Sequence, residues 1–460
     1  MSLNPKLLGL LRTQFGERIT TVATICRQHA IDESWHSPSP PDAVCYPETT
    51  QEVSQLVKLA VQFNTPLIPY GAGTSLEGHI FAPEGGVTVD LSRMNQLLAI
   101  NSEDLDCVIQ PGIRRKGLND QLRHEGLFFP VDPGADASLG GMVATRASGT
   151  NAVRYGTMKD NVLALTAVMA DGAIVHTGTR ARKSAAGYDL TRLLVGSEGT
   201  LGIITEITLK LYPIPDYQAA ARVTFPSTSA AVESAIQVVQ FGVPIARMEL
   251  MDAQGIKAIN EYSKMNLPLL PTLFFEFHGS KSAVSEQADQ VRDIVQEHDG
   301  SDYLWAIKAE DRNQLWHARH TAHYAVIATG QGSRGWTTDV CVPVSKLVDC
   351  IVQTRQDLES SFMDAPIIGH VGDGNFHVIF SVDPDNERQI KEVKRLNERL
   401  VERALQMDGT CTGEHGIGLG KKEWLQQEAG TAIKLMEIIK GALDPKGVLN
   451  PGKIVNHNPS

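Results

Sequence analysis

Three glycine-rich segments in the first half of the chain constrain its fold more than any other feature. They read PYGAGTS at residues 69–75, DPGADASLGGM at 132–142 and GSEGTLGII at 196–204. Small residues directly after a strand let successive backbone N–H groups approach one anion, such as a pyrophosphate. The first segment matches neither GxGxxG at the start of a helix nor the GxxxxGK pattern, which disfavours a Rossmann or P-loop fold. The residues alone leave two interpretations, three structural turns or one cradle for a dinucleotide.

The alternation of predicted strands and helices divides the chain near residue 215. Upstream, residues 161–177 predict a β-hairpin with Asp171-Gly172 as its turn. Pro213 and Pro215 mark a boundary. Beyond it the pattern restarts, with strands at 221–225, 246–250 and 273–277 and helices at 229–241 and 282–297. This alternation fits a second α+β domain, with helices against a mostly antiparallel sheet.

Two histidines and a Glu-His pair near the C-terminus carry the ligands for one divalent metal. His370 and His377 flank residues 372–375, a turn signal between two apolar runs, so a hairpin would turn both imidazoles toward one point. Imidazole and carboxylate together suit zinc, manganese or iron. Glu414 is the candidate third ligand, and His415 would remain as a base. The other interpretation is that these are ordinary polar residues near turns.

Charge and cysteine usage exclude several classes of protein. The net charge is −11, and phosphate binding needs a basic face, so we expect no nucleic-acid partner. The six cysteines are scattered and form no CxxC pair, which argues against a disulfide framework, a cysteine zinc site or an iron–sulfur cluster. We expect reduced, mostly buried thiols.

The sequence carries no membrane or export signal that we can identify. No apolar run approaches the ~20 residues of a transmembrane helix. Residues 1–19 lack a signal-peptide cleavage pattern. Leu7, Leu8, Leu11 and Phe15 predict one helix face that packs on the protein. We therefore expect a cytoplasmic protein and leave open a peripheral contact with a membrane.

The order and the sequences of these segments resemble those of a known flavoprotein superfamily. The three glycine-rich segments resemble the FAD-binding domain of the vanillyl-alcohol oxidase / p-cresol methylhydroxylase (PCMH) superfamily. GHVGDGNFH and GEHGIGLGKK resemble the C-terminal domain of the FAD-linked 2-hydroxy-acid dehydrogenases, and the similarity spans roughly residues 40–455. Within that group, LWHARHTAHYA and GWTTDVCVP are most similar to the cytochrome-type D-lactate dehydrogenases.

The resemblance implies an α+β fold with a two-subdomain PCMH-type FAD-binding domain and a substrate (cap) domain, the latter an antiparallel sheet with flanking helices. The expected segments are an N-terminal helical segment at 1–34, the FAD-binding domain at 35–215, the substrate- and metal-binding cap domain at 216–443, and a tail at 444–460 that returns to the flavin.

The same resemblance implies roles for individual residues. His370, His377 and Glu414 would bind the metal, and His415 would be the catalytic base. Arg319, Arg334 and Asn375 would contact substrate, although relatives carry lysine at the position matched to Arg334. No histidine precedes His79 in the first loop, so FAD is expected to be non-covalent. The implied FAD contacts are Pro69, Gly71, Ala72, Gly73, Thr74, Ser75, Gly78, Pro133, Gly134, Ala135, Ser138, Gly140, Gly141, Ala144, Ser148, Gly149, Glu198, Gly202, Ile203, Ile204 and Asn450.

The activity implied by the resemblance is FAD-dependent, metal-assisted oxidation of a D-2-hydroxy acid to the 2-keto acid, with D-lactate and pyruvate as the preferred pair. Hydride would pass to flavin N5, and electrons would then pass to cytochrome c or a quinone-like acceptor. Glycolate and D-2-hydroxyglutarate are alternative substrates. A flavin subunit that needs partner proteins, or a metal-free oxidase using O₂, are alternatives of another kind. A homodimer is also left open.

Overall fold

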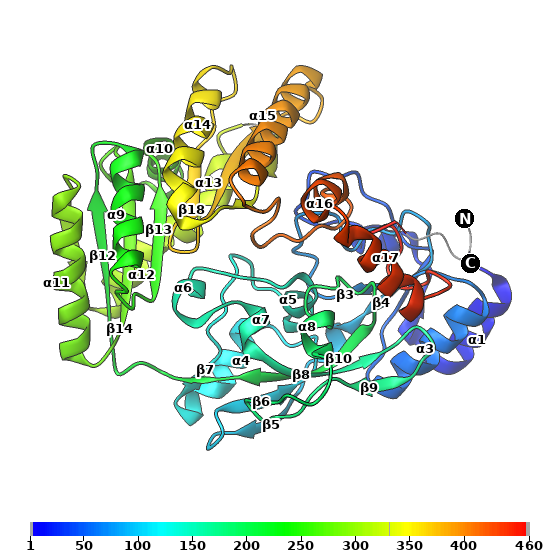
Figure 1. Ribbon diagram of the computed structural model, residues 1–460. Helices are drawn as coiled ribbons and strands as arrows, with labels where there is room; N and C mark the ends of the chain where they lie inside the picture. Colours follow the sequence, from blue (N-terminus) through cyan, green and yellow to red (C-terminus); the bar gives the residue numbers. More distant parts are fainter. Residues whose placement is uncertain (1–2, 331, 457–460) are drawn as a thin grey trace. The chain divides into compact units, whose positions relative to one another are not determined.

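The computed structural model describes residues 3–330 and 332–456, and the chain divides into two compact units (Figure 1). Unit 1 comprises residues 1–148, 156–214 and 414–460, and unit 2 comprises residues 149–155 and 215–413. The ends of the expected terminal segments, residues 1–2 and 457–460, lie outside the described residues.

A four-stranded sheet forms the first part of unit 1. Its strand order is β1-β2-β4-β3, with β2, β4 and β3 parallel and β1 antiparallel to β2. Helix α3 begins where the Thr49 hydroxyl accepts the Glu52 N–H at 3.1 Å, which satisfies a backbone donor at the helix start. The elements are β1 (Ile19–Thr20), β2 (Ala43–Cys45), β3 (Leu67–Tyr70), β4 (Val87–Asp90), α1 (Pro5–Phe15), η1 (Gly16–Arg18), α2 (Ala23–Gln28), α3 (Thr50–Gln62) and η2 (Leu91–Arg93).

An antiparallel five-stranded sheet of order β5-β6-β10-β8-β9 forms the second part of unit 1, beside the short pair β11-β7. The hairpin expected at 161–177 is confirmed as β8 (Val162–Val168) and β9 (Ile174–His176). The other elements are β5 (Leu97–Asn101), β6 (Asp106–Ile109), β7 (Leu127–Phe128), β10 (Ile203–Lys210), β11 (Tyr212–Pro213), α4 (Arg115–Leu122), η3 (Arg123–Glu125), α5 (Leu139–Thr145), α7 (Met158–Asn161) and α8 (Leu190–Leu194).

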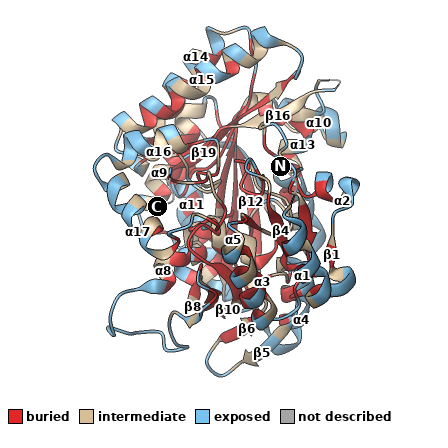
Figure 2. Ribbon diagram, turned by 90° about the vertical axis from the view of Figure 1, so that its right-hand side faces the viewer, coloured by how far each residue is buried: buried red, intermediate tan, exposed pale blue. Residues whose placement is uncertain are grey.

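Each sheet of unit 1 contributes to an apolar core, and the strands β4, β6, β8 and β10 are largely buried (Figure 2). The expected apolar face of α1 is confirmed, because Leu7, Leu11 and Phe15 are at most 3% exposed and pack with α3 and β2. The apolar face of α1 therefore packs against the rest of unit 1 and is not available to a lipid surface.

Unit 2 is one antiparallel sheet of order β15-β12-β14-β13-β18-β19-β16, with β17 also pairing β19. Helices α10, α12 and α13 pack on one face, and α9, α11, α14 and α15 cover the other (Figure 1). The expected strands, helices and antiparallel sheet are confirmed.

The strands of unit 2 are β12 (Tyr217–Thr224), β13 (Arg247–Met251), β14 (Thr272–Gly279), β15 (Ser301–Ala306), β16 (Arg334–Thr337), β17 (Val340–Cys341), β18 (Ile367–His370) and β19 (Asn375–Val382). Its helices are α6 (Ala152–Tyr155), α9 (Thr228–Gln240), α10 (Ala253–Ser263), α11 (Lys281–Glu297), α12 (Ala309–His320), α13 (Ala322–Ile327), η4 (Val344–Lys346), α14 (Leu347–Glu359) and α15 (Glu387–Gln406).

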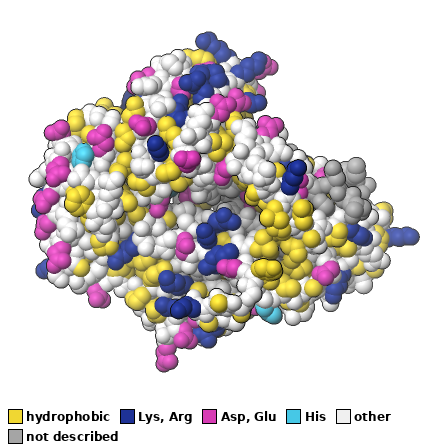
Figure 3. All heavy atoms as spheres, viewed as in Figure 1, with side chains coloured by type: hydrophobic (Ala, Val, Ile, Leu, Met, Phe, Trp, Pro, Cys, Tyr) yellow, Lys and Arg dark blue, Asp and Glu magenta, His cyan; other side chains and the backbone are white. Residues whose placement is uncertain are grey.

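The chain leaves unit 2 after Gly413, whereas the sequence analysis placed the change of domain at residue 443. Residues 414–456 form α16 (Lys422–Ala429), α17 (Ala432–Leu443) and a tail that runs beside β3, where Leu67 N–H donates to Val448 O at 2.7 Å. On α17, the apolar residues Leu435 and Ile438 are 59% and 65% exposed, and hydrophobic side chains gather over this helix in Figure 3.

All six cysteines are free thiols, and five of them are buried, while Cys341 in β17 is partly exposed. This confirms the expectation of reduced, mostly buried thiols. Burial raises the pKa of Cys45 and Cys107 to about 12. In the part of the chain that the structure describes, no helix combines the length and the apolar character needed to cross a membrane.

Candidate active site

One face of the unit 2 sheet gathers the polar residues that the sequence analysis singled out. The register pairs His377 with Ile368 and His370 with Asn375, so all four side chains lie on the same face of β18 and β19. Ile368 belongs to the apolar cluster under α10, α12 and α13. The site is therefore built on the face that these three helices cover.

Glu249 of β13 forms hydrogen bonds with two of the expected site residues. Its carboxylate accepts the Nδ1–H of His370 at 2.6 Å and the Nε–H of Arg319, on α12, at 2.8 Å. Burial would raise the pKa of Glu249, but the charges of His370 and Arg319 outweigh burial and lower that pKa. Glu249 is thus an anion that fixes the imidazole and guanidinium and leaves Nε2 of His370 to serve as a ligand.

A second buried carboxylate, Asp339, organises the neighbouring turn. It is 0% exposed, and it accepts the Asn375 amide N–H at 2.8 Å and the Thr412 hydroxyl at 2.7 Å. The Nδ1–H of His377 donates to Thr338 O at 2.9 Å, which again directs Nε2 outward as a ligand. The Asn375 amide is therefore a structural donor in this turn.

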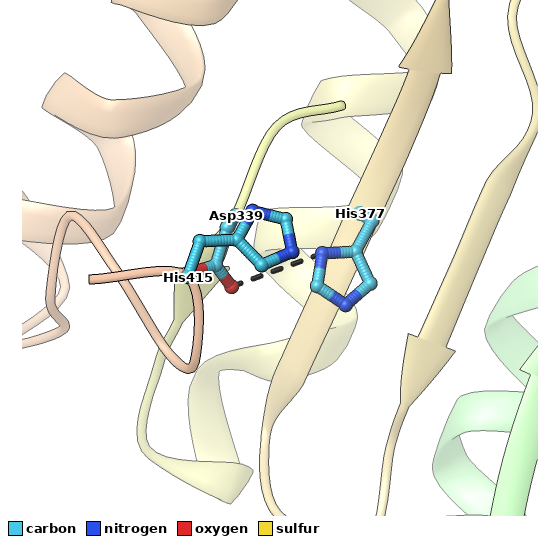
Figure 4. Close-up of side chains that lie close together, drawn as sticks. All are labelled: Asp339, His377 and His415. Carbon is cyan, nitrogen blue, oxygen red and sulfur yellow. Dashed lines mark ion pairs between the residues drawn. The ribbon is translucent and has the colours of Figure 1, made fainter. Parts of the chain in front are cut away.

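Potential metal ligands from His370, His377 and Glu414 lie within 4.8 Å of one another. Asp339, His377 and His415 form an overlapping set at the same limit, shown in Figure 4. Glu414 and His415 directly follow Gly413, the last residue of unit 2, so chain continuity keeps them beside Thr412. Two imidazoles with fixed tautomers and one carboxylate are a donor set that fits Zn²⁺, Mn²⁺ or Fe²⁺.

The two arginines expected to bind substrate are placed differently. Arg319 lies on the site face through its bond to Glu249. Arg334 pairs with Val382, an odd number of residues from His377, so alternation puts Arg334 on the opposite face of the sheet. The structure thus does not bring Arg334 to the cluster. On the site face of the same strand is Thr337, whose hydroxyl lies 3.3 Å from His323 Nδ1.

Within unit 1 the three glycine-rich segments interlock. Gly71 is so close to the Ser138 hydroxyl that a Cβ at Gly71 would collide with it, which joins the first segment to the second. Glu198 N–H donates to Ala144 O at 2.8 Å, which joins the third segment to the second. The Asn450 amide donates to His79 O at 3.1 Å and to Glu198 O at 2.7 Å. Four segments distant in sequence therefore meet in one place.

Buried polar atoms in this place match the needs of a polar cofactor. Among the described residues, Nδ1 of His79, the Ser197 hydroxyl and the Asn450 amide oxygen are buried without a hydrogen-bond partner. Buried polar groups are normally paired, so these atoms fit contacts to a bound dinucleotide. Burial would lower the pKa of His79, but the charge of Glu198 prevails and raises it.

The remaining expected cofactor residues differ in exposure. Ile203 and Ile204 are at most 5% exposed and sit in the two apolar cores, so only their backbone is available to a cofactor. Gly134 is exposed, with open space around its Cα. Ser148 ends the first stretch of unit 1, and Gly149 belongs to unit 2.

Sequence reasoning missed Glu249 and Asp339. Glu249 is 121 residues from His370, and Asp339 is 36 residues from Asn375. No local pattern marks either residue, apart from a charged side chain inside an apolar strand in the case of Glu249. A buried charge requires a partner, and that is the one signal that could have revealed it.

Comparison with known proteins gives two family matches. Residues 41–178 match the family described as FAD binding domain, and residues 214–454 match FAD linked oxidases, C-terminal domain.

Curated relatives cover nearly the whole chain. A protein named probable D-lactate dehydrogenase, mitochondrial, from Danio rerio is 50% identical to this chain. The alignment covers 98% of this chain and 92% of the relative. D-lactate dehydrogenase [cytochrome], mitochondrial, from Arabidopsis thaliana is 47% identical and covers 90% of this chain and 73% of the relative. Among solved structures, p-cresol methylhydroxylase with substrate bound has a TM-score of 0.79 at 15% identity, covering 98% of this chain and 96% of that one, which shows the fold.

The comparisons correct one expectation. Both of these curated relatives are named mitochondrial, so the prediction of a cytoplasmic protein is wrong. The prediction relied on the missing signal-peptide pattern in residues 1–19, and such a pattern reports on secretion rather than on other compartments.

Proposed function

We propose, from the premise that the chain belongs to the FAD-linked oxidase family, that it oxidises D-lactate to pyruvate with the help of a divalent metal. The observation that carries this proposal is the cluster of His370, His377 and Glu414, with Arg319 tied to the same carboxylate as His370. A metal site next to an anchored guanidinium suits a substrate with a hydroxyl beside a carboxylate.

Arg319 is proposed to anchor the substrate carboxylate. Its Nε–H is used by Glu249, which orients the terminal N–H pair as a planar fork. His415 is proposed to take the proton from the substrate hydroxyl, because an imidazole exchanges protons near neutral pH. Asn375, held by Asp339, keeps the turn between the two ligand histidines in shape.

Non-covalent FAD is proposed to lie against the interlocked glycine-rich segments of unit 1, near Ser197 and Asn450. When bound, FAD supplies a two-electron acceptor for the α-hydrogen of the substrate, and the metal supplies Lewis-acid polarisation of the hydroxyl. Electrons would then leave to a cytochrome-type acceptor, which the names of the relatives support.

The deciding experiment mixes the purified yellow protein anaerobically with D-lactate, L-lactate, glycolate or D-2-hydroxyglutarate and follows flavin absorbance, with and without EDTA. Rapid bleaching by D-lactate that EDTA abolishes supports the proposal. Bleaching by another acid would keep the chemistry and replace the substrate. No bleaching by any acid, in protein that holds flavin and metal, would favour a subunit that depends on partners.

The role of His415 is tested by the variant His415→Ala. Loss of a general base lowers the rate of flavin reduction by roughly 10²–10⁴-fold. Flavin and metal content are measured in parallel, so that loss of a base is separated from loss of a cofactor. His176→Ala, at an exposed position of β9, is the control and keeps the wild-type rate. Near-normal turnover in His415→Ala would reject the assignment.

A further inference from the structure

A buried carboxylate in unit 1 holds the segment that follows the proposed base. The Glu198 carboxylate accepts the backbone N–H of Ile417 through Oε1 at 2.7 Å and that of Gly418 through Oε2 at 2.9 Å. These residues lie 219 and 220 positions away in the chain. Both bonds are buried, and Glu198 itself is 5% exposed. Charge-assisted bonds of this kind are among the stronger ones in proteins.

The segment after Gly416 is held from further points of unit 1. A Cβ at Gly416 would lie 2.8 Å from Glu198 Oε1 and 2.8 Å from His79 Nε2, so the backbone can approach only because residue 416 is glycine. Leu419 N–H donates to Glu77 O at 2.8 Å. These contacts fix the position of residues 416–419 within unit 1, and His415 directly precedes them in the chain.

The backbone conformation of Glu198 points to a functional role for its side chain. Its φ is +53°, a left-handed conformation that carries strain for a residue with a Cβ. The nearby Gly196 and Gly199 also have positive φ, and glycine bears such angles without strain. Glu198 is the exception in this turn, and its carboxylate does what no glycine could do, because it accepts both N–H groups of the distant loop.

The carboxylate of Glu198 has a histidine neighbour. His79 Nε2 lies 3.3 Å from Oε1, and both residues are buried. The Asn450 amide binds the backbone carbonyls of His79 and Glu198 together. The backbone of Glu198 and its carboxylate are therefore each held by a contact other than the loop, as preorganisation of an acceptor requires.

We propose that Glu198 is a positioning residue for catalysis, which sets the place of His415 by binding the backbone N–H groups of Ile417 and Gly418. This inference rests on the proposed function for the role of His415. The GSEGTLG segment would then have a second role beside its expected contact with FAD. Its residue Glu198 would also hold the loop that carries His415.

The test is the variant Glu198→Gln in the full-length, FAD-loaded protein. A carboxamide keeps the shape but presents an NH₂ donor to one of the two backbone donors, so one bond is lost and replaced by repulsion. Amide hydrogen exchange at Ile417 and Gly418 becomes at least about tenfold faster, as expected for a segment that opens more easily. Displacement of the base lowers kcat about 100-fold, whereas KM, which reports on Arg319, stays within about twofold.

Asp444→Asn is the matched control. Asp444 is a buried carboxylate of the same unit that accepts two consecutive backbone N–H groups, from Val448 at 3.0 Å and Leu449 at 2.8 Å, and pairs with Lys440. Its variant loses the same kind of clasp in another turn, so exchange at Ile417 and Gly418 stays as in the wild type. Equal acceleration in both variants would mean that Glu198 acts only through general stability.

Gly416→Ala is the second variant, in case Glu198→Gln does not fold. The added methyl group contacts Glu198 and His79 and so displaces residues 417–418 from the Glu198 carboxylate, while every buried charge stays in place. Faster exchange at residues 417–418 together with a lower kcat supports the proposal. A folded Glu198→Gln protein with wild-type exchange, or with faster exchange and wild-type kcat, overturns it. If the wild type oxidises none of the acids, the proposed function fails, and the exchange data alone still decide whether the clasp exists.

Discussion

Two buried glutamates, one in each unit, hold active-site groups by different means. Glu249 in unit 2 binds two side chains, the imidazole of His370 and the guanidinium of Arg319. Glu198 in unit 1 binds two backbone N–H groups, those of Ile417 and Gly418. Both carboxylates are at most 5% exposed.

The difference lies in what each carboxylate controls. A carboxylate bound to side chains sets the orientation and charge of the reacting groups themselves, such as the tautomer of a ligand histidine. A carboxylate bound to backbone sets where a loop lies, and the loop carries the side chains. Loss of Glu249 should therefore change ligand and substrate affinity, whereas loss of Glu198 should change the placement of the base.

Among the variants of unit 2, the largest effect is expected for Glu249→Gln. The variant removes the charge that faces Arg319 and leaves the His370 tautomer unfixed, so metal affinity falls roughly 10- to 100-fold and the KM for D-lactate rises. Metal affinity is measured by titration of the chelator-treated protein, and KM from steady-state rates.

Glu276→Gln is the matched control for that experiment. Glu276 of β14 also holds a histidine and an arginine, His278 at 2.7 Å and Arg247 at 3.4 Å, but neither belongs to the metal cluster. Unchanged metal affinity in Glu276→Gln, with reduced affinity in Glu249→Gln, supports the comparison. A Glu249→Gln protein that binds metal as tightly as the wild type, but exchanges faster at residues 417–418, would reverse the roles of the two glutamates.

A smaller effect is expected for Arg319→Lys. Lysine keeps the charge but cannot donate to Glu249 and offer a planar fork at the same time. One charged hydrogen bond is lost, which raises KM by roughly tenfold or more, while kcat changes less. Steady-state kinetics on D-lactate measure both constants. A lower kcat at constant KM would show that Arg319 acts on the transition state rather than on binding.

The smallest effect concerns stability in acid. Burial would raise the pKa of Glu276, but Arg247 and the bond from His278 prevail and lower it from 4.5 to about 2. A depressed folded pKa contributes stability above the ordinary pKa, and that contribution disappears as pH falls from about 4.5 to about 2. Glu276→Gln should therefore show a flatter decline in unfolding free energy between those values, measured by urea titration. An identical slope in both proteins would show that Glu276 does not stabilise the fold as an anion.

The sequence predicted those parts of the molecule that depend on neighbours in the chain. Hairpin signals located β8 and β9, and helical spacing located α9 and α11, because these patterns arise within a dozen residues. His370 and His377 were found because a short turn joins them. Glu249 and Glu198 act on partners 121 and 219 residues away, and spacing carries no record of such pairing.

Arg334 illustrates a second limit. Its charge and its place in the sequence suggested a substrate contact, but the face of a strand residue depends on register. In β16 the register turns Arg334 away from the site face and Thr337 toward it. A pattern of residue types could not have determined which of the two faces the metal ligands.

The burial of the cysteines makes the protein suited to attachment of a single probe. Thiols react as thiolates, and burial raises the pKa of Cys45 and Cys107 to about 12 and that of Cys350 to about 11, so at neutral pH these three remain unreactive. Cys341, partly exposed in β17 two residues after Asp339, is then the thiol that a maleimide dye would label first. A fluorophore introduced there without mutagenesis would report on the turn that carries both ligand histidines.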